Sequence, residues 1–356
     1  MTFQSLIKNK DDAFSLARSI APFFKSRLMD NVGNQAETIS VQDVDYITKE
    51  LKDVFEYELK IHFISDQGQL FQTVVAREFE NEDMMNLEIE RYGEIVGRTV
   101  LFNDITPKPL VKVDALTRSI VLEKIEGSTL DELGISQELK DFILGRIYGI
   151  LHGNEILSVS EENVLEFFKF LLTHLRFTDE EKNRLVPLLQ THFTKFSECF
   201  GGFTPQTIIV SDHISFRLNE TIQLVDKEMI AQGHMVLSTI KSEIPDELTD
   251  ERMRDIAYYF HDRTYLEFME TGNINKTIGQ MKEFFEGYLL AANIHQMPPL
   301  NEVYPSGITL DIQLLFVAWL REVEKIQKGE NILNEDKDLL RYSYFLLTQN
   351  PLKSLF

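Results

Sequence analysis

The spacing of apolar residues changes once along the chain, and this change constrains the fold more than any other feature. From Tyr57 to Arg77 apolar and polar residues alternate, as in Leu59, Ile61 and Phe63, which is typical of β-strands. Beyond Gly127 apolar residues recur at three- and four-residue steps, which is typical of α-helices. A β-rich part followed by a larger helical part predicts an α+β fold with two lobes.

Local signals place the expected elements. The turn residues Asp66-Gln67-Gly68-Gln69 predict a hairpin between strands at 57–65 and 70–77. Residues 1–55 are expected to form an N-terminal helical extension, with helices near 14–24 and 41–51. A charged helix at 82–97 and strands at 110–113 and 119–125 should follow. Further helical spacing occurs at 130–133, 137–152, 161–175, 180–200, 250–269, 274–294, 310–327 and 337–348.

Composition limits the partners. The chain has 356 residues, 43% of them hydrophobic, and can bury a large core. A net charge of −21 repels nucleic acids and anionic membranes, and no apolar run approaches the ~20 residues of a membrane-spanning helix. The single cysteine, Cys199, and an N-terminus without a secretory signal predict a cytoplasmic protein. The negative field would attract a cationic small substrate, although it also simply keeps proteins soluble.

Two aspartates bracket a β-hairpin predicted at 208–228. Asp212 follows the apolar run Ile208-Ile209-Val210, and Asp226 follows Leu224-Val225. Phosphoryl transfer from ATP needs such a pair, because one carboxylate deprotonates the attacking hydroxyl and another holds magnesium. Taken alone, the pair is explained equally well if Asp212 simply begins a turn and Asp226 simply ends a strand.

Several segments, in order, resemble the aminoglycoside phosphotransferase and choline kinase-like family, which has a protein-kinase-like fold. Residues 120–133, with Glu123 ending a strand before Gly127, resemble its hinge. Val74-Val75-Ala76-Arg77 resembles the strand that grips nucleotide phosphates, with Arg77 in the place of lysine. The Asp212 and Asp226-Lys227-Glu228 segments resemble its catalytic and metal motifs. Leu151-His152 and Phe284-Phe285-Glu286-Gly287-Tyr288 also match, so that the resemblance spans roughly residues 55 to 295.

The resemblance implies a small antiparallel β lobe at 56–124, a helical lobe at 125–356, and a site for ATP and magnesium. The implied acceptor is a hydroxyl group of a small molecule. By this resemblance Arg77 would clamp the nucleotide phosphates, and Glu88 would be its ion-pair partner, with Glu90 and Glu94 as alternatives. Glu123 and Ile125 would contact the nucleotide. Asp212 would be the catalytic base, and Asp226 with Glu228 would bind magnesium.

The sequence also departs from the family pattern. Val210 and Ser211 replace the histidine and glycine before the catalytic aspartate, and no glycine-rich loop precedes Val74. Arg217 stands where the family has a metal-binding asparagine, although Ser215 or Asn219 could be the equivalent. Three functions therefore remain open: an ATP-dependent small-molecule phosphotransferase, a catalytically inactive pseudokinase that acts as a binding or scaffold module, and an unrelated helical interaction protein in which the motifs are accidental. The oligomeric state is not predicted.

Overall fold

The structure is a computed structural model that divides into two compact units. The sheet unit comprises Met1–Thr129, Thr207–Glu220 and Gly233–Ser242, and the helical unit comprises Leu130–Gln206, Thr221–Gln232 and Glu243–Phe356. The described residues are 7–25, 27–28, 36–50, 54–100, 105–107, 109–124, 127–152, 161–190, 198–199, 208–211, 235–237, 250–294, 309–329 and 335–355.

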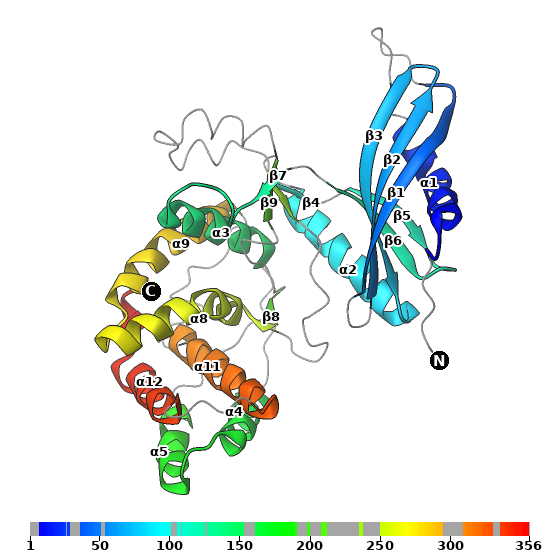
Figure 1. The fold of residues 1–356 in the computed structure, drawn as a ribbon. Helices are drawn as coiled ribbons and strands as arrows, with labels where there is room; N and C mark the ends of the chain where they lie inside the picture. Colours follow the sequence, from blue (N-terminus) through cyan, green and yellow to red (C-terminus); the bar gives the residue numbers. More distant parts are fainter. Residues whose placement is uncertain are drawn as a thin grey trace. The chain divides into compact units, whose positions relative to one another are not determined.

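A five-stranded sheet forms the centre of the sheet unit (Figure 1). Its order is β1-β2-β3-β6-β5, and each neighbouring pair is antiparallel. The predicted hairpin is confirmed, because Ser65 pairs with Gly68 across the turn. The strands are β1 (Ile39–Glu50), β2 (Val54–Ser65), β3 (Gly68–Phe79), β5 (Leu110–Asp114) and β6 (Ser119–Glu123).

Two helices cover opposite faces of this sheet (Figure 1). Helix α1 (Lys10–Lys25) buries Ala17 and Phe24 against strand residues that include Leu59 and Val74. Helix α2 (Glu82–Thr99) begins at Asn81, whose side chain accepts a hydrogen bond from the Met84 N–H and caps the helix. It packs on the other face, so alternate residues of a strand face different helices.

The helix predicted at 41–51 is wrong, because the described residues of this range, 41–50, belong to strand β1. A β-bulge between Val41 and Asp43 shifts the register against β2, so Val41 and Val44 lie on the same face although they are three residues apart. The bulge thereby gives a strand the three-residue spacing of a helix. Residues 39–50 consequently belong to the same sheet as 54–65, and the helical extension predicted for residues 1–55 contains a strand.

A second sheet in the sheet unit has the order β4-β10-β9-β7. Its central pair is antiparallel, with Val210 of β9 opposite Met235 of β10. Strand β9 also pairs with β7, which places Ser211 opposite Gly127. The residue before Asp212 thus lies beside the segment that follows β6. The strands are β4 (Ile105–Pro107), β7 (Gly127–Thr129), β9 (Ile208–Ser211) and β10 (Met235–Leu237).

The helical unit confirms most of the predicted helices and, with the sheet unit, the α+β class. Helices α3 and α9 pack closely: a Cβ atom at Gly145 would overlap the carbonyl of Phe284, and one at Gly287 would overlap that of Phe142. Both glycines therefore permit this approach. The helices are α3 (Gln137–His152), α4 (Glu161–His174), α5 (Asp179–Gln190), α8 (Arg252–Thr271), α9 (Asn275–Ile294), α11 (Thr309–Gln327) and α12 (Glu335–Gln349), followed by the short 3-10 helix η2 (Pro351–Leu355).

Three helix predictions in this unit need correction. Helix α5 ends at Gln190, and Cys199 lies in strand β8 (Glu198–Cys199), where it pairs with Asp250 of β11 (Asp250–Glu251). Helix α8 accordingly begins at Arg252 rather than at 250. Residues 130–133 form turns. Within the described ranges, no helix combines the length and the apolar character needed to cross a membrane.

Candidate functional site

Arg77 and Glu88 form an ion pair in the sheet unit. Arg77 lies near the end of β3, and Glu88 lies on α2, the helix that follows. The Arg77 Nη1 atom donates to Glu88 Oε1 at 3.0 Å, and the Glu88 side chain is only 5% exposed. Glu88, Glu90 and Glu94 were the three candidates for the ion-pair partner of Arg77. The structure pairs Arg77 with Glu88, whereas Glu90 is exposed. The roles of this pair in nucleotide binding stay predictions.

A second carboxylate, which the sequence did not single out, also holds Arg77. Glu56 lies directly opposite Arg77 in the β2–β3 pairing, and its Oε2 atom accepts from Arg77 Nε at 3.1 Å. One guanidinium is therefore shared by two carboxylates from different elements. The signal was present in the sequence, because a two-residue turn at Asp66-Gln67 fixes the hairpin register and counting outward from it reaches this pair.

Glu123 occupies the end of β6, but its side chain points to the face covered by α1. Its Oε1 atom accepts hydrogen bonds from Arg27 Nη1 at 2.6 Å and from Gln72 Nε2 at 3.0 Å. Its Oε2 atom is buried without a hydrogen-bond partner among the described residues. Residue Arg27 comes just after α1, so this contact ties the N-terminal helix to the predicted hinge.

The main chain at the predicted hinge is partly engaged within the sheet. The Glu123 N–H donates to the Pro109 carbonyl at 2.9 Å, and the Lys124 N–H donates to the Thr73 carbonyl at 3.0 Å. An adenine base at Glu123 would therefore have to be held by its carbonyl oxygen. The Lys124 side chain pairs with Glu58 at 2.7 Å. Ile125, the other predicted contact of the base, lies outside the described residues.

The predicted catalytic and metal residues are not described by the structure. Asp212, Asp226 and Glu228 all fall in 212–234, as does Arg217. Strand β9 confirms only that a strand ends immediately before Asp212. Within the described part of the chain, no group of three His, Cys, Asp or Glu side chains is arranged to hold a metal ion. A magnesium site at Asp226 and Glu228 stays a prediction.

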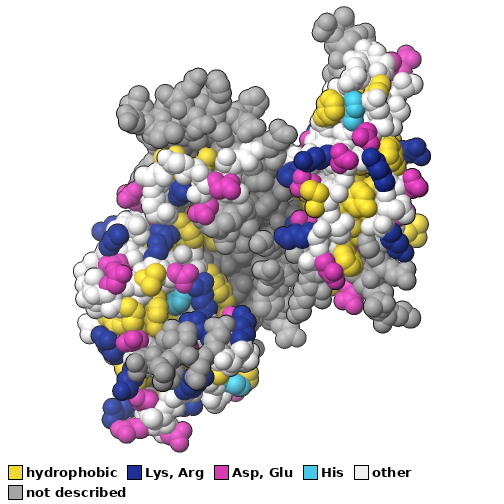
Figure 2. Space-filling view, viewed as in Figure 1, with side chains coloured by type: hydrophobic (Ala, Val, Ile, Leu, Met, Phe, Trp, Pro, Cys, Tyr) yellow, Lys and Arg dark blue, Asp and Glu magenta, His cyan; other side chains and the backbone are white. Residues whose placement is uncertain are grey.

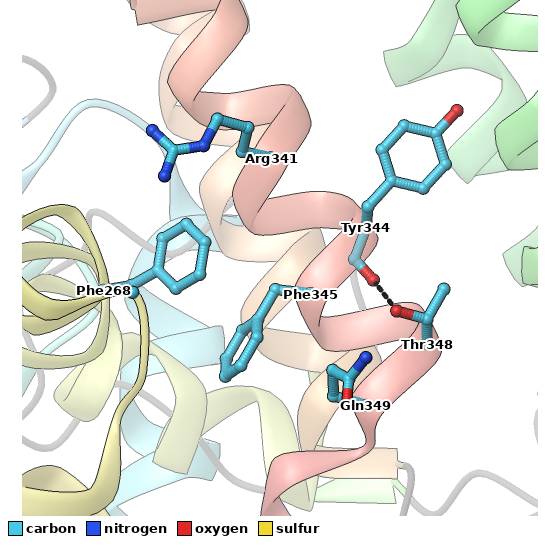
Figure 3. Close-up of a pocket in the computed structure, with 7 residues that line it drawn as sticks. Phe268, Arg341, Tyr344, Phe345, Thr348 and Gln349 are labelled. Atoms are coloured by element: carbon cyan, nitrogen blue, oxygen red, sulfur yellow. Dashed lines mark hydrogen bonds between the residues drawn. The ribbon is translucent and has the colours of Figure 1, made fainter.

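A cavity of about 530 Å³ lies in the helical unit, between the end of α8 and α12 (Figure 3). The ring centroids of Phe268 and Phe345 lie 4.7 Å apart, and the Thr348 hydroxyl donates a hydrogen bond of 2.6 Å to the Tyr344 carbonyl. Arg341 supplies its positive charge. The seven described residues that line it include no carboxylate, so it lacks the groups that phosphoryl transfer requires.

Charged side chains of both signs are interspersed on the face of the molecule that Figure 2 shows. Figure 2 shows Lys and Arg side chains standing among Asp and Glu side chains on the visible face of the described residues. Neither sign of charge is gathered in one region of the described part of this face, and the net charge of −21 counts the whole sequence. It favours no particular substrate beyond the general attraction of cations.

Comparison with known proteins finds similarity among solved structures only. No protein-family model and no curated protein matches the sequence. Solved structures with similar folds include a macrolide 2'-phosphotransferase from Brachybacterium faecium (TM-score 0.45, 12% identity, covering 85% of this chain and 93% of that one). A second is a choline kinase from Streptococcus pneumoniae (TM-score 0.43, 14% identity, covering 94% of this chain and 99% of that one). A third is an ethanolamine kinase from Plasmodium vivax (TM-score 0.46, 11% identity, covering 98% of this chain and 92% of that one).

Each of these neighbours is named as a phosphotransferase or a kinase. At such identities and TM-scores the likeness assigns neither an activity nor a substrate to this chain. What the chain can do chemically has to be argued from its own residues.

Proposed function

We propose that this chain is an ATP-dependent phosphotransferase that acts on a hydroxyl group of a small molecule. The observation that carries the proposal is the ion pair between Arg77 of β3 and Glu88 of the following helix. Protein kinases require a cation on the third strand and a glutamate on the next helix in this arrangement, because the pair positions the cation for the nucleotide phosphates. Arg77 can do this with a guanidinium, which binds phosphate oxygens well.

The other roles follow from the sequence motifs. The Glu123 carbonyl and Ile125 would hold the adenine base, and Asp212 would accept the proton of the attacking hydroxyl. Asp226 and Glu228 would hold magnesium through their carboxylate oxygens. Magnesium, when bound, neutralises the charge that develops between the transferred and the leaving phosphates. The acceptor class is a small alcohol, and the net charge of −21 makes a cationic alcohol the first to test.

Calorimetric titration with Mg-ATP and an assay of ADP formation test this function. The wild-type protein should bind Mg-ATP, and Asp226→Ala should weaken binding by about tenfold or more because a metal ligand is lost. With a panel of alcohols, with and without an ammonium group, Asp212→Asn should abolish ADP formation while it leaves Mg-ATP binding in place. The enzyme hypothesis fails if wild-type protein binds no Mg-ATP and Asp226→Ala changes nothing.

A pseudokinase is the second candidate, and two observations favour it. Glu56 occupies Arg77 together with Glu88, and the sequence has Arg217 near the predicted metal ligands. A guanidinium cannot coordinate magnesium. This candidate predicts that no acceptor stimulates ADP formation. Any turnover that Asp212→Asn abolishes would exclude it.

A further inference from the structure

We infer that Glu56 sets the nucleotide affinity of this site by competing with phosphate for the guanidinium of Arg77. The inference rests on the proposed function for the identity of the ligand. It concerns a carboxylate that the kinase-like motifs do not include. Its basis is the way in which the donor atoms of Arg77 are already used.

An arginine side chain offers a phosphate two edges, each with two N–H groups in parallel. One edge consists of Nε and Nη2, and the other of Nη1 and Nη2. In this structure Nε donates to Glu56 at 3.1 Å, and Nη1 donates to Glu88 at 3.0 Å. Glu56 therefore occupies one of the two donors of the Nε–Nη2 edge, and Glu88 occupies one N–H group of Nη1. A phosphate can take two parallel hydrogen bonds from the Nε–Nη2 edge only if Glu56 gives way.

Glu56 is the carboxylate that should give way. Its side chain is 24% exposed, whereas that of Glu88 is 5% exposed. A carboxylate that leaves its partner must be solvated, and this costs less where water already reaches it. Glu88 would then stay in place and hold the guanidinium for the phosphate. The two carboxylates thus have opposite effects on the nucleotide.

Charge adds to the competition. The two ion pairs of Arg77 bring one guanidinium and two carboxylates together, and the charges of these three groups sum to −1. The Arg77 side chain is only 15% exposed, so solvent screens these charges incompletely. A triphosphate therefore meets repulsion from Glu56 as well as a donor that is already occupied.

The chain offers a matched control two residues along the same strand. Glu58 lies on the same face of β2 and is 29% exposed, but it pairs with Lys124 at 2.7 Å rather than with Arg77. Glu58→Gln removes the same charge from the same surface without touching the guanidinium. A difference between the two variants then reports the contact with Arg77 and not the general field.

Calorimetry of the full chain with Mg-ATP and with adenosine tests the inference. Glu56→Gln should bind Mg-ATP about tenfold more tightly than wild type, because a neutral amide holds the guanidinium less strongly than a carboxylate does. Its adenosine affinity should not change, since adenosine has no phosphate. Glu58→Gln should bind Mg-ATP within about twofold of wild type, and Glu88→Gln should bind it more weakly.

Glu56→Asp keeps the charge but withdraws the carboxylate, so it should give a smaller gain and provides a second variant if Glu56→Gln does not fold. The outcomes separate this inference from the proposed function. If wild type binds Mg-ATP and Glu56→Gln gains nothing over Glu58→Gln, Glu56 does not compete, although the proposed function stands. Binding by Glu56→Gln alone supports the inference and favours the pseudokinase. If no protein binds Mg-ATP, both are contradicted.

Discussion

The two units use arginine and carboxylate pairs in contrasting ways. In the helical unit, Arg263 binds Asp141 with two parallel hydrogen bonds of 2.9 and 3.0 Å, and the Asp141 side chain is fully buried. The Tyr259 hydroxyl also donates to Asp141 at 2.6 Å, and its ring lies 4.5 Å from the guanidinium. In the sheet unit, Arg77 gives one bond to each of two carboxylates, and one of these is partly exposed.

The difference lies in whether a pair is complete. Asp141 and Arg263 match one charge with one charge in the geometry that arginine and carboxylate favour, so neither gains by exchanging its partner. Arg77 is shared, and each carboxylate takes only part of its fork. The first arrangement suits a structural link between α3 and α8, and the second suits a group that accepts a ligand.

Removing Asp141 should have the largest effect on stability. Asp141→Ala leaves the Arg263 guanidinium, which is 25% exposed, without its carboxylate, and such losses cost about 3–5 kcal/mol in the free energy of unfolding. Urea denaturation measures this cost, and Asp141→Asn is the variant of matched size. A loss below about 1 kcal/mol would mean that the pair is as exchangeable as the Arg77 cluster.

A buried imidazole in the helical unit should give the next largest effect, seen as a dependence on pH. Burial, with Arg321 adding to it, lowers the pKa of His261 from 6.5 to about 4. Between these values the unfolded chain binds a proton that the folded chain does not, so stability falls as the pH falls. The loss from this residue amounts to about 3 kcal/mol between pH 6.5 and 4.

Urea denaturation of His261→Gln across this range isolates the contribution, since other groups titrate equally in both proteins. The variant should lose about 3 kcal/mol less than wild type on acidification. His174→Gln makes the same substitution at an exposed histidine and serves as the control. Equal acid sensitivity of His261→Gln and wild type would show that the imidazole is accessible to protons in the folded state.

The smallest effect should come from the contact that ties α1 to β6. Arg27→Met keeps an apolar stem near Phe23 but removes the guanidinium that pairs with Glu123. We expect a loss of about 1 kcal/mol in the free energy of unfolding, because Arg27 is 39% exposed and solvent screens the pair. Arg27→Lys, which keeps the charge, should lose less in the same urea measurement. A loss as large as that of Asp141→Ala would place this contact with the complete pairs.

Much of the fold could be predicted from periodicity because burial imposes it. The hairpin of β2 and β3 and the helices α8, α9 and α12 each present one face to a core, and their apolar spacing reports that face. Strand β1 could not be predicted in this way, since its bulge changes the spacing. Strands β8 and β11 are too short to carry a pattern, and their pairing joins residues far apart in the sequence.

In the candidate site, only residues whose positions follow from the order of the motifs along the chain could be predicted from the sequence. Arg77 and Glu88 follow from the order of the motifs, and the structure brings them together. The contact of Glu56 with Arg77 was not predicted, because charged residues alternate with apolar ones around Glu56 and only the hairpin register distinguishes it from Glu58. The contact of Arg27 with Glu123 was not predicted for another reason. It depends on how α1 packs on the sheet, and no local sequence pattern encodes that packing.

Titration of Mg-ATP into the wild-type protein and into Arg77→Met tests most directly whether the shared arginine is a phosphate site. The variant keeps an aliphatic stem of similar length but lacks the guanidinium. We predict that wild type binds Mg-ATP and that Arg77→Met binds it at least about tenfold more weakly, with adenosine affinity unchanged. Equal Mg-ATP affinities of the two proteins would contradict the assignment.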